Sequence, residues 1–446
     1  MNHPHFSSSG GRQNAPFAGL GPFLTLWATQ SLSTLGSSMT SFALIIWSYQ
    51  QAGSALTTAL LSVCSYAPYV ALSIFAGALS DRWDKKRTML VCDTLAAACT
   101  LLAFGLLSSG HLAIWHLYVL NAVNGLMNTF QQPASEVAVT LLAPKEQYQR
   151  VSGLKSFSNS LNTILTPILA SAVLAFGGMR MVILVDLATF AVAFVGLACF
   201  IHLPHTPQEQ SAAVQGVWQS TREGLSYLRG HRGILDLILF LAAINLTASV
   251  YNAALPAMLL SRAGGGELAL GWVNTCTGLA NVAGSILVSF SRPPKSRVRV
   301  ICNCLLASMG IENVLLAFGR SLPVWCTGAI LGWLLIPIMN ANMNVLMRNH
   351  IPVALQGRVY AARNSLQFFT IPVGYLLGGF LVDGVFEPLM AAQAPGSLLV
   401  RLFGSGKGSG AAMLFLLLAV VGEATCLIFR RDQRLWSLDE WPDGKP

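Results

Sequence analysis

The chain has 446 residues, of which 54% are apolar and only 10% are charged, and its formal net charge is +9. This composition excludes an ordinary water-soluble globular protein and predicts an integral membrane protein. In such a chain the positive charge reports topology rather than a nucleic-acid-binding surface.

Long apolar runs separated by charged or Pro- and Gly-rich breaks dominate the sequence. A helix needs about 20 such residues to cross the hydrocarbon core, and continuously apolar runs favour helices over a barrel. We expect twelve spans, at 22–48, 56–79, 88–108, 113–142, 151–176, 181–202, 233–260, 269–290, 299–319, 322–348, 358–384 and 410–430. The predicted fold class is therefore an all-α membrane protein with twelve transmembrane helices.

The basic residues predict the orientation, because Lys and Arg are enriched in short loops on the cytoplasmic side of the membrane. With the N-terminus inside, 22 of the 27 basic residues lie inside. The outside receives only Arg180, Arg262, Arg320, Arg401 and Lys407. Both termini are predicted to be cytoplasmic.

The chain divides into two halves around one long polar break. A shift of 208 residues brings Arg150 onto Arg358 and Lys155 onto Arg363, which indicates parallel, pseudo-symmetric six-helix repeats. The expected parts are a cytoplasmic tail (1–21), a first half (22–202), a cytoplasmic linker (203–232), a second half (233–430) and a second cytoplasmic tail (431–446).

The stretch "GALSDRWDKKR", which begins at Gly77, interrupts the apolar sequence with a dense set of charges. It resembles the Gly-x-Leu-x-Asp-Arg-x-Gly-Arg-Lys loop of the major facilitator superfamily. Together with "QQPASEVAV" and "LQGRVYAARNSLQF", it looks most like the bacterial branch of macrolide-efflux and enterobactin-exporter proteins. The chain departs from the loop's pattern at Asp84, where a second Gly is usual. It departs from drug/proton antiporter patterns at Asn121, where an Arg is frequent, and at Thr166-Pro167, where Gly-Pro is usual.

The charged loop predicts a gate. A carboxylate at Asp81 is placed to meet the N-terminal end of span 11, near Arg358, whose free N–H groups favour negative charge. Lys85 and Glu136 are expected to relay charge to this latch, and the gating loop comprises Gly77, Asp81, Arg82, Lys85, Glu136 and Arg358. The alternative for the bases is that they only anchor the loop on the cytoplasmic side.

Amide side chains recur at helical spacing in spans that the resemblance places around a central path, namely spans 1, 4, 7 and 10. The predicted substrate cavity contains Gln30, Asn121, Asn124, Asn128, Asn245, Tyr251, Asn252, Asn340 and Asn344. Amides in hydrocarbon are costly unless they are paired or face water. The alternative is that they bind the helices to one another.

No Lys or Arg is expected deep in any span, which argues against anionic substrates and favours a neutral or cationic amphipathic molecule. The predicted protein is a secondary active exporter of such a molecule, drug- or macrolide-like, working by alternating access. An ion gradient is expected to drive it, with protons as the coupling ion and Glu312, Asp186 and Glu423 as candidate carriers.

Two other functions remain open: export of a self-made metabolite such as a siderophore, and a non-transporting sensor or assembly factor on the same scaffold. No enzymatic activity, cofactor, metal or nucleic-acid partner is expected. The predicted location is the bacterial cytoplasmic (inner) membrane, with both termini inside and the protein a monomer.

Overall fold

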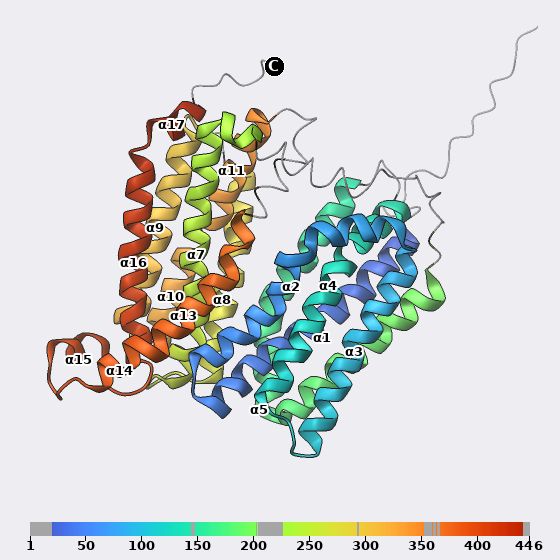
Figure 1. The fold of residues 1–446 in the computed structure, drawn as a ribbon, viewed down its shortest axis with the longest axis horizontal. Helices are drawn as coiled ribbons and strands as arrows, with labels where there is room; N and C mark the ends of the chain where they lie inside the picture. The colour runs from blue at the N-terminus through green and yellow to red at the C-terminus, as the bar shows by residue number, and fades with distance from the viewer. Residues whose placement is uncertain are drawn as a thin grey trace, which may run out of the picture.

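The computed structural model describes residues 20–143, 148–201, 203, 226–291, 294–351, 359, 363 and 366–439. The described residues form helices and no strand. The first half contains α1 (Gly21–Ala52), α2 (Ala55–Arg82), α3 (Lys85–Ser108), α4 (Ile114–Leu142), α5 (Tyr148–Val195) and the π-helical turn η2 (Gly196–Phe200). These bounds follow the predicted spans closely (Figure 1).

The predicted spans 5 and 6 appear as the single long element α5, which contains one break. Gly178 has φ 66° and ψ −175°, a conformation that interrupts the helix and that a residue with a side chain rarely adopts. The chain therefore turns back at Gly178, between two helical segments.

The second half contains α7 (Arg232–Ser261), α8 (Glu267–Phe290), α9 (Arg297–Phe318), α10 (Leu322–Trp333), α11 (Ile336–His350), α13 (Thr370–Phe380), the π-helical η3 (Leu381–Phe386), α14 (Glu387–Ala391), α15 (Leu398–Phe403), α16 (Ser409–Arg430), α17 (Gln433–Trp436) and the 3₁₀ turn η4 (Ser437–Asp439). The predicted span 322–348 is divided into α10 and α11, with Pro337 in the first turn of α11. Proline lacks the N–H that a continuous helix would use, which accounts for the division.

Eight helical segments of the described chain are long and apolar enough to cross a membrane. One of them, Gly153–Phe200, includes the break at Gly178. Three further helices, α1, α4 and α8, have 32, 29 and 24 residues and are long enough to cross the hydrocarbon core.

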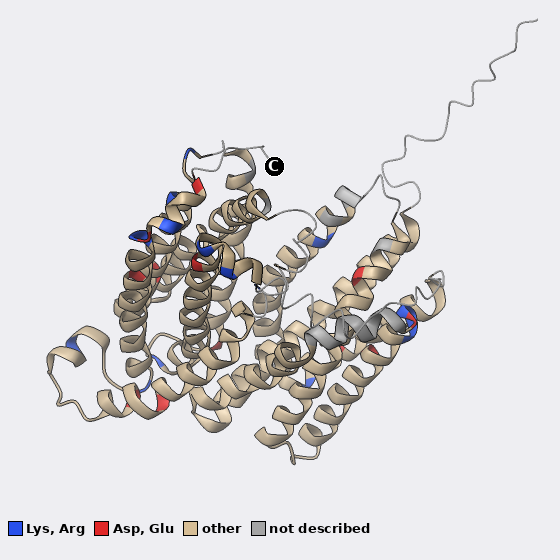
Figure 2. Cartoon of the chain, turned by 45° about the horizontal axis from the view of Figure 1, so that its top comes forward, with Lys and Arg blue, Asp and Glu red and all other residues tan. Residues whose placement is uncertain are grey.

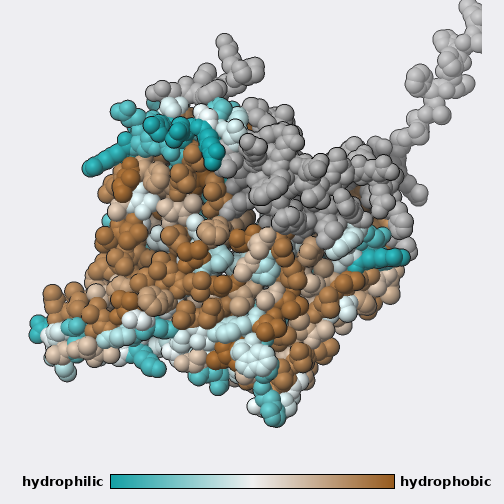
Figure 3. Space-filling model, viewed as in Figure 1, coloured by the Kyte–Doolittle hydropathy of each residue, from teal (hydrophilic) through white to brown (hydrophobic). Residues whose placement is uncertain are grey.

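The helices form two bundles, one from each half (Figure 1). We call the end where α3 and α9 begin and α16 ends the basic end, because Lys85, Arg297 and Arg430 mark it. Figure 2 shows Lys and Arg gathered there on the second bundle, and Figure 3 shows a broad apolar surface below them. The bundles meet near the opposite end, which carries α14 and α15, and diverge towards the basic end (Figure 1).

The chain after α16 folds back on the second half. Asp439 accepts hydrogen bonds from Ser296 Oγ at 2.5 Å and from the backbone N–H of Arg297 at 2.8 Å. A carboxylate at a helix N-terminus is favourable because the first N–H groups have no partner within the helix. The end of the described chain therefore caps α9 at the basic end.

Candidate functional site

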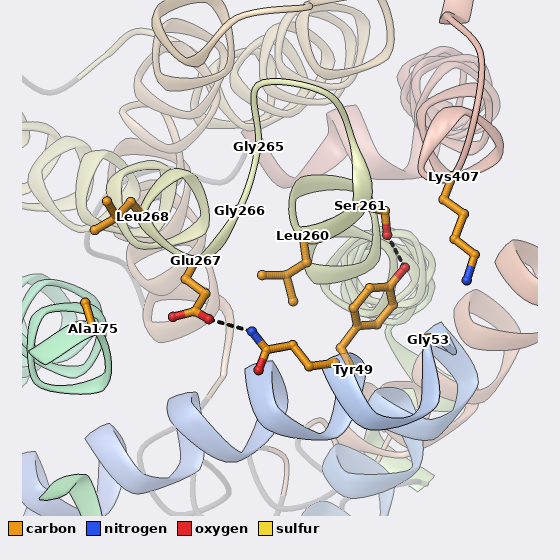
Figure 4. Close-up of a pocket in the computed structure, with 11 residues that line it drawn as sticks. Tyr49, Gly53, Ala175, Leu260, Ser261, Gly265, Gly266, Glu267, Leu268 and Lys407 are labelled. Atoms are coloured by element: carbon orange, nitrogen blue, oxygen red, sulfur yellow. Dashed lines mark hydrogen bonds between the residues drawn. The ribbon is translucent and has the colours of Figure 1, made fainter. Parts of the chain in front are cut away.

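The two halves are joined at the opposite end by polar contacts around a cavity of about 650 Å³. Tyr49 at the end of α1 bonds to Ser261 at the end of α7, and Gln50 donates to Glu267 at 2.5 Å (Figure 4). Lys407 lines the same cavity. Both hydrogen bonds therefore bridge the two bundles.

A second cross-half contact joins η3 to the start of α2. The carboxylate of Asp383, in η3, accepts hydrogen bonds from Ser54 Oγ at 2.6 Å and from the backbone N–H groups of Ala55 and Leu56 at 3.0 and 2.8 Å. Asp383 of the second half therefore caps the N-terminus of α2 in the first half. Such a charge-assisted cap is stronger than a neutral hydrogen bond.

Small residues let the halves approach closely. A Cβ on Gly379 of α13 would lie 2.6 Å from Leu56 Cα, and a Cβ on Gly271 of α8 would lie 2.5 Å from Ser171 Oγ. A side chain at Gly379 would meet the backbone of α2 and push the bundles apart, whereas one at Gly271 would displace the Ser171 hydroxyl. The glycines therefore serve helix contact across the two halves.

Arg262, just beyond α7, holds the opposite end of the second half together. Its guanidinium donates to the carbonyl oxygens of Leu316 at 3.2 Å and Phe403 at 3.0 Å. Burial, with Arg320 nearby, lowers the pKa of Arg262 to about 10. Arg262 is therefore charged at neutral pH, and its role at this end is structural.

The predicted gating loop lies at the basic end, and its central members fall outside what the structure describes. The side chains of Asp81 and Arg82 and the whole of Arg358 are not among the described residues, although the helix α2 itself, including Gly77, continues to Arg82. Lys85 is buried at the start of α3. Glu136 forms an ion pair with Lys155 at 2.5 Å.

Two other residues of this loop have structural roles. Asp84 is the N-cap of α3 and accepts from the backbone N–H of Arg87 at 2.8 Å, a role that the usual Gly has no side chain to fill. Lys86 donates to the carbonyl oxygens of Ala198 and Ile201 at 2.9 and 2.7 Å, at the end of η2. A cation is favourable at that helix C-terminus.

The predicted amide residues occupy different environments. Asn128, Asn252, Asn340 and Asn344 are exposed, and Asn245 is half-buried. Asn121 donates to the Leu117 carbonyl of its own helix at 2.9 Å. Asn124 is half-buried, and its Oδ1 has no hydrogen-bond partner among the described residues.

The remaining two predicted cavity residues, Tyr251 and Gln30, contact buried acids. Tyr251 is 6% exposed and donates to Glu312 Oε1 at 2.6 Å, to which Trp333 Nε1 also donates at 2.9 Å. Glu312 is itself 4% exposed. This carboxylate on α9 is therefore enclosed by donors from α7 and α10.

The first half contains a matching cluster that sequence reasoning missed. Asp93 on α3 accepts from Gln30 of α1 at 3.2 Å and from Gln131 of α4 at 2.5 Å. In each half, an acid on the third span is thus bonded by side chains of the first and fourth spans. The available signal was Asp93 itself, a carboxylate inside a predicted span.

The other two candidate carriers lie apart from these clusters. Asp186 is 4% exposed and accepts from Ser37 Oγ of α1 at 2.9 Å. Glu423 of α16 faces α9, where a Cβ added to Gly310 would overlap the carboxylate oxygen Oε1 of Glu423. The structure therefore does not bring the three predicted acids together.

An uncharged polar pocket of about 280 Å³ lies between the halves, where α1, α5 and α8 meet. Asn162 donates to Ser38 Oγ at 3.0 Å and accepts from Thr166 Oγ1 at 3.0 Å. Asn274 and Thr277 of α8 complete the polar lining, with Phe42 as an apolar wall. The pocket offers hydroxyl and amide groups to a neutral ligand.

Comparison with known proteins agrees with this arrangement. The Major Facilitator Superfamily model matches residues 26–375. Macrolide efflux protein A of Streptococcus pyogenes is 23% identical over 370 residues, covering 81% of this chain and 90% of that protein. Multidrug efflux pump Tap of Mycolicibacterium fortuitum is 24% identical over 392 residues, covering 85% and 94%.

Solved structures share the fold at low identity. A mutant of the nucleoside transporter NupG superposes with a TM-score of 0.70 at 13% identity, covering 92% of this chain and 99% of that one. A bacterial homologue of the human lysosomal transporter Spinster, in an inward-facing conformation, gives a TM-score of 0.67 at 13% identity, covering 97% and 100%. With its two helical bundles and a family match across most of its length, the chain is a multi-pass membrane transporter, not an enzyme, and belongs to the Major Facilitator Superfamily.

Proposed function

We propose that this transporter exports a hydrophobic or amphipathic, neutral or cationic small molecule by alternating access, driven by a proton gradient. The observation that carries the proposal is the Asp383 cap on α2, which ties the two halves together at the end away from the basic end. A transporter of this kind needs a contact at each end that forms and breaks in alternation. Asp383 supplies one, and the Asp81 loop is proposed to supply the other.

The basic end is proposed to face the cytoplasm, because Lys and Arg are retained on that side. Both termini are then inside, and the bacterial relatives favour the inner membrane. On this orientation the closed end faces outward, and the proposed state of the molecule is inward-facing.

The proposed substrate class rests on the chemistry of the pocket between α1, α5 and α8. Its polar groups are hydroxyls and amides, and no charged side chain lines it among the described residues. Such a lining hydrogen-bonds a neutral, oxygen-rich molecule but gives an anion no counter-charge. The relatives named for macrolide and multidrug efflux point to the same class.

Glu312 is the proposed proton carrier. It is nearly fully buried in the second half and bonded to Tyr251, whose helix α7 also contacts the first half. A buried acid changes protonation when its surroundings change between water and protein. Rearrangement of α7 during transport is therefore expected to couple to the charge of Glu312.

The functional test is a resistance profile. Expression in a drug-sensitive bacterium should raise resistance to macrolides or lipophilic cations and leave resistance to anionic compounds unchanged. A profile restricted to anionic compounds would reject the substrate class. An unchanged profile, with the protein present in the membrane, would count against drug export.

A further inference from the structure

A groove of about 540 Å³ runs between α9 and α16 on the second half, outside the contact between the halves. The lining residues of α9 are Asn303, Leu306, Ala307, Gly310, Ile311 and Val314. Their spacing of three and four residues places them along one side of the helix. The opposite wall contributes Glu423 of α16.

Glu423 lies deep within the apolar length of α16. It is seven residues from Arg430, about 10 Å at a rise of 1.5 Å per residue, and further from Ser409 at the other end. Gly310 leaves the space that its carboxylate occupies, because a Cβ there would overlap Oε1. The carboxylate is therefore placed at hydrocarbon depth, against the backbone of α9.

No described residue pairs with this carboxylate. Glu423 is half-buried, and it forms no hydrogen bond or ion pair with any other residue that the structure describes. A carboxylate in hydrocarbon is costly unless it is paired, so an acid at this depth indicates a binding role by default. The missing partner must come from outside the described chain.

The lining of the groove defines the chemistry of that partner. An anion would be repelled by the carboxylate of Glu423, and a lipid tail would leave this carboxylate unpaired. A molecule with a cationic centre and an apolar body satisfies both Glu423 and the aliphatic wall of Leu306, Ile311 and Val314. Asn303 adds an exposed amide at the end of the groove nearer the basic end.

We propose that the α9–α16 groove binds lipophilic organic cations from the bilayer, with Glu423 as the counter-charge. This site lies outside the contact between the halves. It therefore holds cationic compounds independently of the transport cycle, and the inference stands whether or not these compounds are exported.

The test uses radiolabelled tetraphenylphosphonium and purified full-length protein in nanodiscs, at equilibrium and without a gradient. Saturable binding is expected, weakened about tenfold or more by Glu423→Gln, which removes the charge and keeps the size. Ala307→Phe should weaken it similarly by filling the groove. Asp432→Asn, which neutralises an acid outside the membrane and keeps an N-cap residue, should leave the affinity unchanged.

Tetraphenylborate, an anion of the same shape, separates charge recognition from apolar partitioning. It is expected not to compete for the site. Equal affinity of wild-type and Glu423→Gln protein for the cation would overturn the proposal, as would equal competition by the anion. Insensitivity to Ala307→Phe would place the cation elsewhere, and a Glu423-dependent dimer that excludes the cation would assign the groove to a second copy. Because no transport is measured, a negative result here leaves the export proposal standing.

Discussion

The backbone N–H of Leu56 donates to the carboxylate of Asp383 at 2.8 Å, so an acid of the second half caps a helix of the first. The Asp81 loop is predicted to make the converse contact at the other end, from the first half to the second. We propose that these two caps act as a two-state switch: the state described here has the Asp383 cap, and the alternative state gains the Asp81 cap and loses the Asp383 cap.

Asp383→Asn is expected to loosen the opposite end. It removes the charge that three hydrogen bonds share, and hydrogen bonds to charged groups contribute roughly 1.5–3 kcal/mol. A shift of about tenfold or more away from the state described here should follow. Distances between spin labels, introduced as unnatural amino acids at the cavity-lining residues Ala175 of the first half and Leu268 of the second, should lengthen in this variant.

Ser54→Ala is the control, because it removes one bond to Asp383, and the bond from the Thr57 N–H to Ser54 Oγ, but leaves both backbone bonds to Asp383. Its distance distribution should change less than that of Asp383→Asn. Equal distributions in wild-type and Asp383→Asn protein would show that the cap does not hold this end closed.

Asp81→Asn is expected to act in the opposite direction. The variant should reach the membrane normally but transport more slowly, because the state closed at the basic end loses its cap. Export rate per amount of membrane protein measures this effect. Wild-type export by a well-expressed variant would show that the basic-end latch is not needed.

Asp93→Ala is expected to destabilise the first half. It leaves the amides of Gln30 and Gln131 without their shared acceptor, at a cost of about 1–3 kcal/mol. Asp93→Asn keeps an acceptor and should lose less. Thermal unfolding of the purified variants tests the order, and a lower melting temperature for Asn than for Ala would contradict it.

The exposed amides provide a test of substrate contact. Asn128→Ala and Asn252→Ala should change substrate preference more than abundance, because neither residue forms a described hydrogen bond within the protein. Asn124→Ala is expected to behave in the same way. The measurement is the drug-resistance profile of each variant, normalised to the amount of the protein in the membrane. If all three variants mainly reduce the folded yield, the amides hold helices together instead.

Glu312→Gln is expected to abolish acceleration of export by a proton gradient while exchange of substrate without a gradient continues. Tyr251→Phe, which removes one donor and keeps the acid, should retain coupling with an altered pH dependence. Unchanged gradient dependence in Glu312→Gln would discard this carrier. Unchanged dependence also in Asp186→Asn, Glu423→Gln and Glu136→Gln would discard coupling through these carboxylates.

The apolar helical segments could be predicted from the sequence, because apolar length and charged breaks are local properties. Residues that pair across helices were harder to predict. Asp383 lies near the end of an apolar span, and nothing in its neighbourhood indicates that α2 begins beside it. Tyr251 and Gln30 fit a polar stripe at helical spacing, yet both bond to acids that are distant in sequence. The two partners of such a contact are 61 to 329 residues apart in the sequence.

Accumulation of a radiolabelled macrolide in inverted membrane vesicles tests the central claim most directly. The cytoplasmic face of such vesicles is outward, so an acid interior should drive uptake by exchanging protons for substrate. We predict accumulation that requires the protein, rises with the imposed pH difference and collapses on addition of an uncoupler. Accumulation that is indifferent to the gradient and the uncoupler would contradict proton-driven export.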